Sequence, residues 1–331
     1  MRPMKILLTL DYELFLGERS GTVEKCLVQP MRQMLQQVDE LGVKFTLFAD
    51  AAYLYKLHEL SGQYSALARD FQTMKAELQT LVKEGHDVQL HIHPQWYYST
   101  FNDNQWKLDQ RHYKLTDMPK DEIETLFKES KTLLDDIVSY KTHAFRAGGF
   151  SAQPFGTLKH LFEKNGLTVD SSACPGTRYD SAQQQYDYTD CPNLSKYSFE
   201  DDISVVSENG RFTEVPITMY PVSPTFYWHL ALTRLMKNKK HMKFGDGDSV
   251  KTSAGSIKER LTKRALSLST IDGLKISYLY DSLKYAASCG NELFCVIGHP
   301  KLATKYSIEA LGVFCRRIIK EGHEFITISR V

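Results

Sequence analysis

The chain has 331 residues, a nearly neutral net charge of +1 and 42% hydrophobic residues. This length can bury a large core, and the overall charge gives no support for binding to nucleic acid or a membrane surface. Six scattered cysteines without a CxxC pair indicate a reducing compartment. The apolar run after Lys5 is too short for a signal peptide or a membrane span, so we expect a cytoplasmic protein.

Short apolar runs alternate with helical patterns along most of the chain. Pro30 opens the first predicted helix, Gly42 ends it, and Asp121 is the expected N-cap of a later one. This alternation is typical of a mostly parallel sheet whose strands all end on the same side. Strands are predicted at 5–10, 43–48, 88–90, 143–145, 167–169, 293–297 and 325–328, and helices at 30–41, 70–83, 121–138, 155–164, 276–288 and 308–320.

The middle of the chain departs from this alternation. Residues 94–118 are aromatic and polar and predict a long loop. The segments 203–206 and 211–217 flank Asn209-Gly210, a pair that favours a β-hairpin. From about 226 to 268 the sequence is basic and has no clear strand, which predicts a solvated insertion. A lid, or a site for an anionic carrier group such as a phosphate, is the less favoured alternative.

Two pairs of polar residues follow predicted strands. Asp11 and Glu13 are two residues apart, as are His91 and His93, and this spacing places each pair on one face of a strand. Two acids after a buried strand are costly unless they are paired or bind a cation. Neutral imidazoles are common ligands of zinc-like ions. The pattern favours a metal site over the alternatives, which are a turn or cap for the acids and structural roles for the histidines.

Further candidates stand at other strand ends. Arg146 precedes two glycines and could orient a carboxylate such as Asp11, with an ordinary ion pair as the equal alternative. His299 follows an apolar run and can donate a proton near neutral pH. Asp170 either supports the site or caps a turn. Cys174 has no obvious base nearby in the pattern, so we interpret it as inert.

Two other features of these segments have structural interpretations. His86 lies before its strand and is predicted to be structural. The aromatic residues of the long loop either stack against a sugar ring or simply pack the loop; they are Trp96, Tyr97, Tyr98 and Trp106.

Together these segments resemble the polysaccharide deacetylases of the NodB-homology type, a group of metal-dependent N- and O-deacetylases. The resemblance covers about 5–218 and 276–328. It implies an α/β fold, a distorted (β/α) barrel of about seven strands, as one domain over 1–331 with a hairpin and a basic helical insertion at about 225–270. The motifs follow the family's order: Thr9-Leu-Asp11-Tyr-Glu13, Gly42-Val-Lys-Phe-Thr46-Leu-Phe48, Gly85-His86-Asp-Val-Gln-Leu-His91, Phe145-Arg146-Ala-Gly-Gly149-Phe, Val169-Asp170-Ser-Ser172, Glu214-Val-Pro216 and Ile297-Gly-His299-Pro300.

The resemblance also implies roles for these residues. Asp11 would be the general base, oriented by Arg146, and His299 the general acid. One divalent metal ion, with Zn²⁺ the expected one, would be bound by Glu13, His91 and His93.

Two departures from the family pattern bear on these roles. The family usually spaces its ligands His-x-x-x-His, and the chain has Gln95 at the second position, so His93 must substitute. The arginine motif lacks the usual Pro-Tyr, and some relatives with altered motifs are metal-free amide or imide hydrolases.

The expected function is removal of an acetyl or similar acyl group from an N-acetylated sugar. A nucleotide- or lipid-linked intermediate of surface-polysaccharide synthesis suits a cytoplasmic enzyme better than a cell-wall polymer does. No nucleic-acid partner and no stable membrane insertion are expected. The alternatives are a metal-free cyclic amide or imide hydrolase, a catalytically inactive carbohydrate-binding barrel, and a glycosidase, in which the histidines would have no role.

Overall fold

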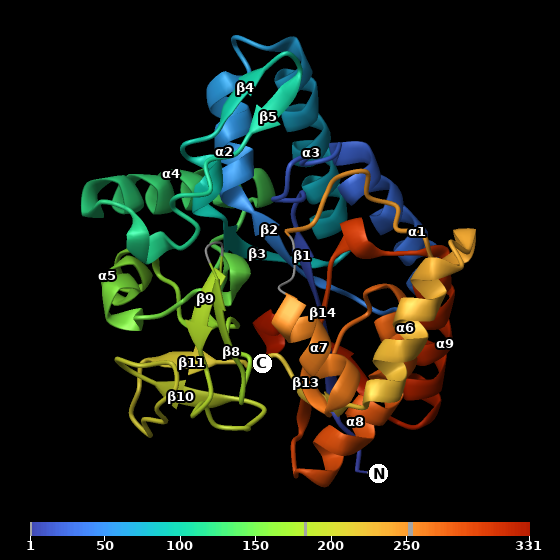
Figure 1. Ribbon diagram of the computed structural model, residues 1–331. Helices are drawn as coiled ribbons and strands as arrows, with labels where there is room; N and C mark the ends of the chain where they lie inside the picture. Colours follow the sequence, from blue (N-terminus) through green and yellow to red (C-terminus); the bar gives the residue numbers. More distant parts are fainter. Residues whose placement is uncertain (1, 182–183, 251–253) are drawn as a thin grey trace. The chain divides into compact units, whose positions relative to one another are not determined.

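The computed structural model describes residues 2–181, 184–250 and 254–331 (Figure 1). These residues form two compact units. The first comprises 2–10, 14–44 and 217–326, and the second comprises 11–13, 45–216 and 327–331. Strand β1 (Lys5–Tyr12) therefore begins in the first unit and ends in the second. Among the described residues, no helix combines the length and apolar character that a bilayer span needs.

The second unit contains a mainly parallel sheet with the strand order β10-β11-β7-β6-β3-β2. Its parallel strands are β2 (Thr46–Asp50), β3 (Asp87–Ile92), β6 (Ala144–Ala147), β7 (Val169–Asp170) and β11 (Phe212–Glu214), and β10 (Tyr197–Phe199) pairs antiparallel with β11. The helices of this unit are α2 (Ala51–Leu60), α3 (Ser65–Lys83), α4 (Lys120–Val138) and α5 (Phe155–Asn165). Two small hairpins add β4 (Thr100–Asn102) with β5 (Gln105–Lys107), and β8 (Arg178–Ser181) with β9 (Gln184–Asp187).

The register of this sheet decides which polar residues become neighbours. Asp50 at the end of β2 pairs with His91 of β3, and His91 pairs with Arg146 of β6. Asp170 of β7 lies opposite Glu214 of β11. Parallel strands place their carboxyl ends at one edge, so this row of charged residues lies along that edge.

The first unit is built on β1, whose initial residues pair in parallel with β14 (Leu293–Gly298) and β15 (Glu324–Ile326). Its helices are α1 (Gln29–Val38), α6 (Pro224–Leu235), α7 (Ala254–Thr262), α8 (Leu279–Ser288) and α9 (Lys305–Lys320). Strands β12 (Met219–Val222) and β13 (Ala265–Leu268) form an antiparallel pair. Short helical turns η1–η9 occur at Glu24–Val28, Asp39–Leu41, Pro94–Trp96, Leu115–Asp117, Gly148–Phe150, Lys239–His241, Gly273–Tyr278, Pro300–Leu302 and Ile328–Arg330.

Most predicted strands and helices are confirmed within a few residues, and four predictions are corrected. The predicted loop at 94–118 contains the β4–β5 hairpin and the turns η3 and η4. The hairpin partner of β11 is Tyr197–Phe199 and not 203–206, because Phe199 packs its ring against Phe212 and Phe155. Helix α4 begins at Lys120 with Pro119 at the N-cap, so Asp121 lies in its first turn. The basic stretch 226–268 is not without strands, because its end forms β13 against β12.

Candidate metal centre and active site

The three predicted metal ligands converge at the ends of β1 and β3. Ligand atoms of Glu13, His91 and His93 lie within 4.8 Å of one another, and each residue is at most 6% exposed. The two imidazole rings lie on one side of the chain, with centroids 4.8 Å apart, as the two-residue spacing predicts. The cluster thus includes His93. The family resemblance places the second histidine ligand two residues later, at position 95.

The hydrogen bonds of His91 show that this cluster fits a cation. His91 Nδ1 lies 2.7 Å from the carbonyl oxygen of Arg146, so Nδ1 carries the proton and donates it. Nε2 is then a lone-pair acceptor, and it faces Glu13 Oε2 at 3.1 Å. His93 Nε2 contacts the same oxygen. Acceptors that face each other need a positive charge between them, and two imidazole nitrogens with one carboxylate suit a zinc-like ion.

A proton on His91 is the alternative to a metal ion at this position. Burial lowers the pKa of His91, but the hydrogen bond to Glu13 and the charges of Asp11 and Asp50 outweigh this effect and raise the pKa to about 9. Three buried carboxyl groups act on His91, those of Asp11, Glu13 and Asp50, and one buried guanidinium, that of Arg146, lies beside Asp11. A divalent cation would offset this excess of acids.

Arg146 is fully buried and is fixed on several sides. Its Nη1 donates to Asp11 Oδ1 at 2.7 Å. Its Nε donates to the carbonyl of Ser171 at 2.8 Å, and its Nη2 donates to the Ser171 hydroxyl at 2.9 Å. The guanidinium also lies over the ring of Phe48, 4.2 Å from its centroid. This arrangement holds the Asp11 carboxylate in one orientation.

A buried pair of carboxyl groups holds the turn that contacts Arg146. Asp170 accepts hydrogen bonds from the backbone N–H and the hydroxyl of Ser172, at 3.0 and 2.9 Å. Glu214 Oε1 accepts the N–H of Ala173 at 3.0 Å. Burial raises the pKa of both acids, and the neighbouring Asp170 raises that of Glu214 further. Two buried carboxyl groups side by side favour a state that holds one proton between them. Asp170 thus caps the turn whose Ser171 contacts Arg146.

The sequence interpretation missed the role of Asp50. Its Oδ1 accepts the N–H of His93 at 3.3 Å, and its Oδ2 accepts Trp96 Nε1 at 2.8 Å. Burial raises the pKa of Asp50, although the nearby histidines act in the opposite direction. Its signal in the sequence is the same as that of Asp11: an acid directly after a buried strand.

The aromatic loop packs against this side of the site. Trp96 is fully buried, and its ring lies 4.5 Å from Tyr53 and 5.3 Å from Trp106 between centroids. For Trp96 the packing interpretation is therefore correct, and a sugar cannot stack on it.

Gly148 makes room for His93. A Cβ atom on Gly148 would lie 2.6 Å from His93 Nδ1 and 2.7 Å from the carbonyl oxygen of Ile92. Both distances are too short for a side chain, so only glycine allows this approach of β6 to the end of β3. The first glycine of the pair after Arg146 is thus required for packing against the candidate ligand His93.

His299 lies at the end of β14 in the first unit and has Asp272 as its partner. Asp272 Oδ1 accepts the N–H of His299 at 2.8 Å, and Oδ2 lies 2.9 Å from its Nδ1. Burial raises the pKa of Asp272, but the charge and hydrogen bonds of His299 outweigh it and lower the pKa. The carboxylate orients the ring and leaves Nε2 as its other polar atom. The sequence interpretation missed Asp272, which follows the alternating segment Ser267-Leu-Ser-Thr-Ile271.

The environments of Cys174 and His86 agree with their predicted inert and structural roles. Burial raises the pKa of the Cys174 thiol well above its usual value, which opposes a nucleophilic role. His86 is buried, and its Nδ1 accepts the backbone N–H of Phe45 at 3.0 Å.

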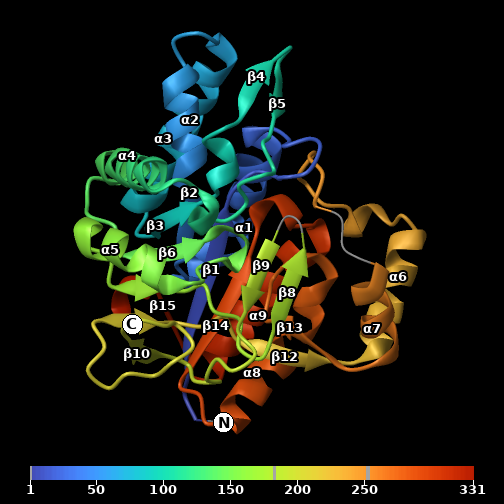
Figure 2. The ribbon, with the colours of Figure 1, turned by 60° about the vertical axis from the view of Figure 1, so that its left-hand side comes forward.

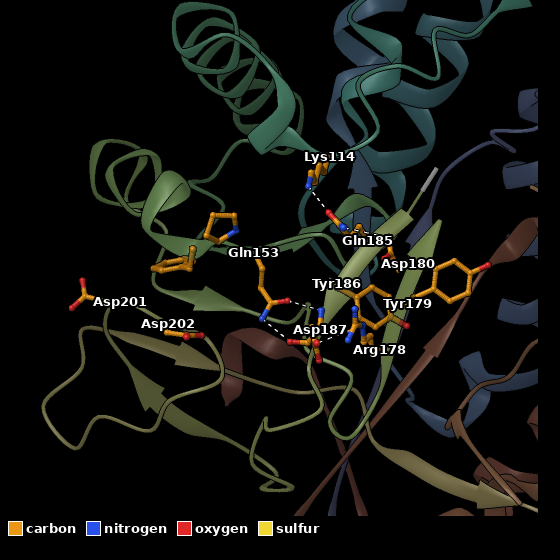
Figure 3. Close-up of a pocket in the computed structure, with 12 residues that line it drawn as sticks. Lys114, Gln153, Arg178, Tyr179, Asp180, Gln185, Tyr186, Asp187, Asp201 and Asp202 are labelled. Carbon is orange, nitrogen blue, oxygen red and sulfur yellow. Dashed lines mark hydrogen bonds and ion pairs between the residues drawn. The ribbon is translucent and has the colours of Figure 1, made fainter. Parts of the chain in front are cut away.

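A surface pocket of about 410 Å³ lies beside the β8–β9 hairpin (Figure 3). The hairpin carries the cross-strand pair Tyr179 and Tyr186, with ring centroids 6.3 Å apart. Gln153 bridges to it by hydrogen bonds to both backbone groups of Asp187. The hairpin is also tied to Gly149, whose carbonyl accepts Gln184 Nε2 at 2.9 Å. This polar, tyrosine-bearing pocket was not predicted from the sequence.

The sequence matches no protein-family model and no curated protein. Among solved structures, it is similar to a Mycobacterium smegmatis protein described as a polysaccharide deacetylase, with 12% identity and a TM-score of 0.50 over 100% of this chain and 90% of that chain. It is also similar to Puue allantoinase, with 13% identity and a TM-score of 0.53 over 98% of this chain and 88% of that chain. At these identities the similarity describes the fold. The chain therefore has the fold of the polysaccharide deacetylases, the distorted (β/α) barrel that its sequence predicts.

Proposed function

We propose that the protein is a metal-dependent hydrolase that removes an acetyl or similar acyl group from an N-acetylated sugar. One observation carries this proposal: the cluster of Glu13, His91 and His93 is directly linked to the buried Arg146–Asp11 pair. The link is the 2.7 Å hydrogen bond between His91 Nδ1 and the carbonyl of Arg146. A candidate ligand and the residue that orients the candidate base thus share one contact.

The side chains would divide the chemistry as follows. Glu13, His91 and His93 would hold a divalent ion such as Zn²⁺, which would supply a water of lowered pKa and polarise the acyl carbonyl. Asp11, held by Arg146, accepts the proton of the attacking water. His299, oriented by Asp272, donates a proton to the departing amine. Each acid or base group should contribute roughly 10²–10⁴-fold in rate.

The substrate is proposed to be a nucleotide- or lipid-linked sugar intermediate of surface-polysaccharide synthesis in the cytoplasm. The pocket beside β8 and β9 supports a carbohydrate ligand, because tyrosine rings and many polar side chains line it. Sugars are bound by this combination, since each ring has apolar faces and hydroxyl groups at its edge.

A second candidate is the metal-free hydrolysis of a cyclic amide, which the similarity in fold to an allantoinase supports. The two facing acceptors His91 Nε2 and Glu13 Oε2 favour the metal-dependent enzyme. Metal content separates the two candidates, because a metal-free hydrolase contains no stoichiometric divalent ion at this cluster.

The test measures acetate released from N-acetylated sugars, both free and nucleotide-linked, together with the bound metal. Asp11→Asn and His299→Ala should each lower the rate by roughly 10²–10⁴-fold without loss of metal. His58→Ala, an exposed histidine of α2, is the matched control and should behave as wild type. Acetate release at the wild-type rate by both variants would overturn the assignment. Saturable sugar binding without any turnover would support an inactive carbohydrate-binding barrel.

A further inference from the structure

The basic charge of this protein is concentrated in one segment. Residues 224–264 contain ten lysines and arginines and three acidic residues, whereas the whole chain has a net charge of +1. In the structure this segment forms α6, the turn η6 and α7, all in the first unit. Helices α6 and α7 lie side by side at the edge of that unit (Figure 2). The proposed chemistry does not use this segment.

Helix α6 exposes an apolar stripe. Trp228, Leu232 and Leu235 are spaced by four and three residues, and they are 56%, 55% and 77% exposed. Met236, the C-cap residue, continues the stripe and is 69% exposed. With 3.6 residues per turn, these four positions fall within about 100° of the helix circumference. An exposed helix face is normally polar, so this stripe marks an interaction surface.

The opposite face of α6 explains why the stripe is outside. Tyr227 is buried in a small core with Val222 of β12 and Tyr278. Thr233 is buried on the same side of the helix. Trp228 donates its indole N–H to the carbonyl of Leu261 in α7 at 3.1 Å, which holds its ring while leaving most of it exposed. The helix is therefore fixed by one face and cannot turn its apolar stripe inward.

Basic side chains are frequent in the same segment. Arg234 lies in the last turn of α6, and seven further lysines and arginines of this segment are exposed: Lys237, Lys239, Lys240, Lys243, Lys258, Lys263 and Arg264. Exposed apolar residues continue on the same segment at Met242 and Ile257. An apolar helix face with a tryptophan, in a basic segment, is typical of helices that lie in the interface of an anionic bilayer.

We propose that the surface formed by α6, η6 and α7 docks on an anionic lipid bilayer. Helix α6 has 12 residues and is about 18 Å long, too short to cross a bilayer core of about 30 Å, so it would lie in the plane of the interface. A second copy of the chain is a poorer partner, because two such basic surfaces repel each other. The proposal goes beyond the hydrolase and does not depend on it.

Vesicle co-sedimentation of the full chain tests this proposal. Phosphatidylcholine vesicles with phosphatidylglycerol should bind the protein, phosphatidylcholine alone should bind it much less, and salt should weaken the binding. The double variant Leu232→Ser with Leu235→Ser should lose about tenfold or more in affinity. Lys237→Glu with Lys239→Glu should lose a similar factor and most of the salt dependence.

Matched controls separate docking from damage to the protein. Val313→Ser, an exposed valine of α9, and Lys128→Glu, an exposed lysine of α4, should bind vesicles as wild type does. Both double variants should keep the wild-type melting temperature, since the altered side chains are exposed, and their hydrolysis of a water-soluble sugar should be unchanged. A protein without hydrolase activity that still binds anionic vesicles would contradict only the proposed function.

Two results would overturn the docking proposal. The first is equal sedimentation with and without anionic lipid, or unchanged binding in both double variants. The second is a concentration-dependent dimer, measured by sedimentation velocity, that the leucine variant abolishes while no vesicle binding occurs. The second result would assign the stripe to a second copy of the chain.

Discussion

Arg146 Nη1 lies 2.7 Å from Asp11 Oδ1, and both side chains are buried although 135 residues separate them in the sequence. The guanidinium also donates to the carbonyl and the hydroxyl of Ser171, and the backbone carbonyl of Arg146 accepts the Nδ1 proton of His91. The pair therefore has both a structural and a positional role, and the two can be tested separately.

Replacing Arg146 should destabilise the protein strongly. Arg146→Met leaves the Asp11 carboxylate buried without its cation, which typically costs about 3–5 kcal/mol in the free energy of unfolding. Adding Asp11→Asn should recover part of this loss, because the buried charge is then removed. Urea unfolding of the wild type, of Arg146→Met and of the double variant measures both effects. If Arg146→Met lowers the free energy of unfolding by less than about 1 kcal/mol, burial of Asp11 without its cation is not costly, and the prediction is wrong.

The ligand cluster should determine metal binding. Glu13→Ala, His91→Ala and His93→Ala should each weaken the binding of Zn²⁺ by about 100-fold or more, since each removes one of three ligands. Isothermal titration and metal analysis of the purified protein give the affinity and the stoichiometry. His58→Ala serves again as the control with an intact cluster. Stoichiometric zinc in all three variants would place the ion elsewhere.

The pH dependence of metal binding follows from His91, whose pKa is raised to about 9. A proton on His91 competes with the metal ion, so the affinity should rise by about tenfold per pH unit as the pH increases toward 9 and then level off. The chelated protein should show the opposite trend. Its stability from the His91–Glu13 pair is complete below the ordinary pKa of 6.5 and is lost as the pH rises through about 9.

Thermal unfolding of the chelated protein over this pH range measures the second effect. His91→Gln should not show the loss of stability that the His91–Glu13 pair causes as the pH rises through about 9, because its side chain does not titrate. An equal decline in the variant and the wild type would assign the pH dependence to another residue.

Adding one methyl group at position 148 should displace a ligand. Gly148→Ala would place a Cβ 2.6 Å from His93 Nδ1, so we expect a loss of about 10-fold or more in zinc affinity and a lower melting temperature. Gly156→Ala is the matched control, because it lies in α5 with open space around its Cβ. It should stabilise the helix by up to about 1 kcal/mol. Similar effects of the two substitutions would contradict the crowding argument.

The carboxyl pair should make stability depend on pH. Burial raises the pKa of Glu214 well above 4.5, so the folded chain keeps a proton that the unfolded chain releases. This stabilisation is complete below about pH 4.5 and is lost as the pH rises toward the folded pKa. Glu214→Gln retains a donor toward Asp170 and cannot release a proton. Its free energy of unfolding should therefore decline less than that of the wild type as the pH rises.

Urea unfolding at a series of pH values tests this difference. Glu208→Gln changes an exposed glutamate in the same way and should follow the wild type. Parallel stability curves for wild type and Glu214→Gln would mean that the pair does not hold a shared proton.

Much of the fold was predictable because its signals are local. Apolar strands, glycine stops and the helical pattern of α9 are each set by neighbouring residues, and these elements are confirmed. Helix α2 was missed because it is buried on most sides, at Lys56 as well as at its apolar residues, so its sequence shows no clear periodicity. The partner strand of β11 was misplaced because the choice depends on aromatic packing between distant residues.

The sequence by itself determined the candidate groups: acids, histidines and an arginine at strand ends, spaced so that each pair shares a face. The tertiary structure decided their partners. It placed Glu13 with the histidines and Asp11 with Arg146, added Asp50, Asp272 and the Asp170–Glu214 pair, and left the apolar stripe of α6 exposed. The physical reason is that spacing fixes the direction of a side chain, whereas strand register and burial between distant segments fix what it meets.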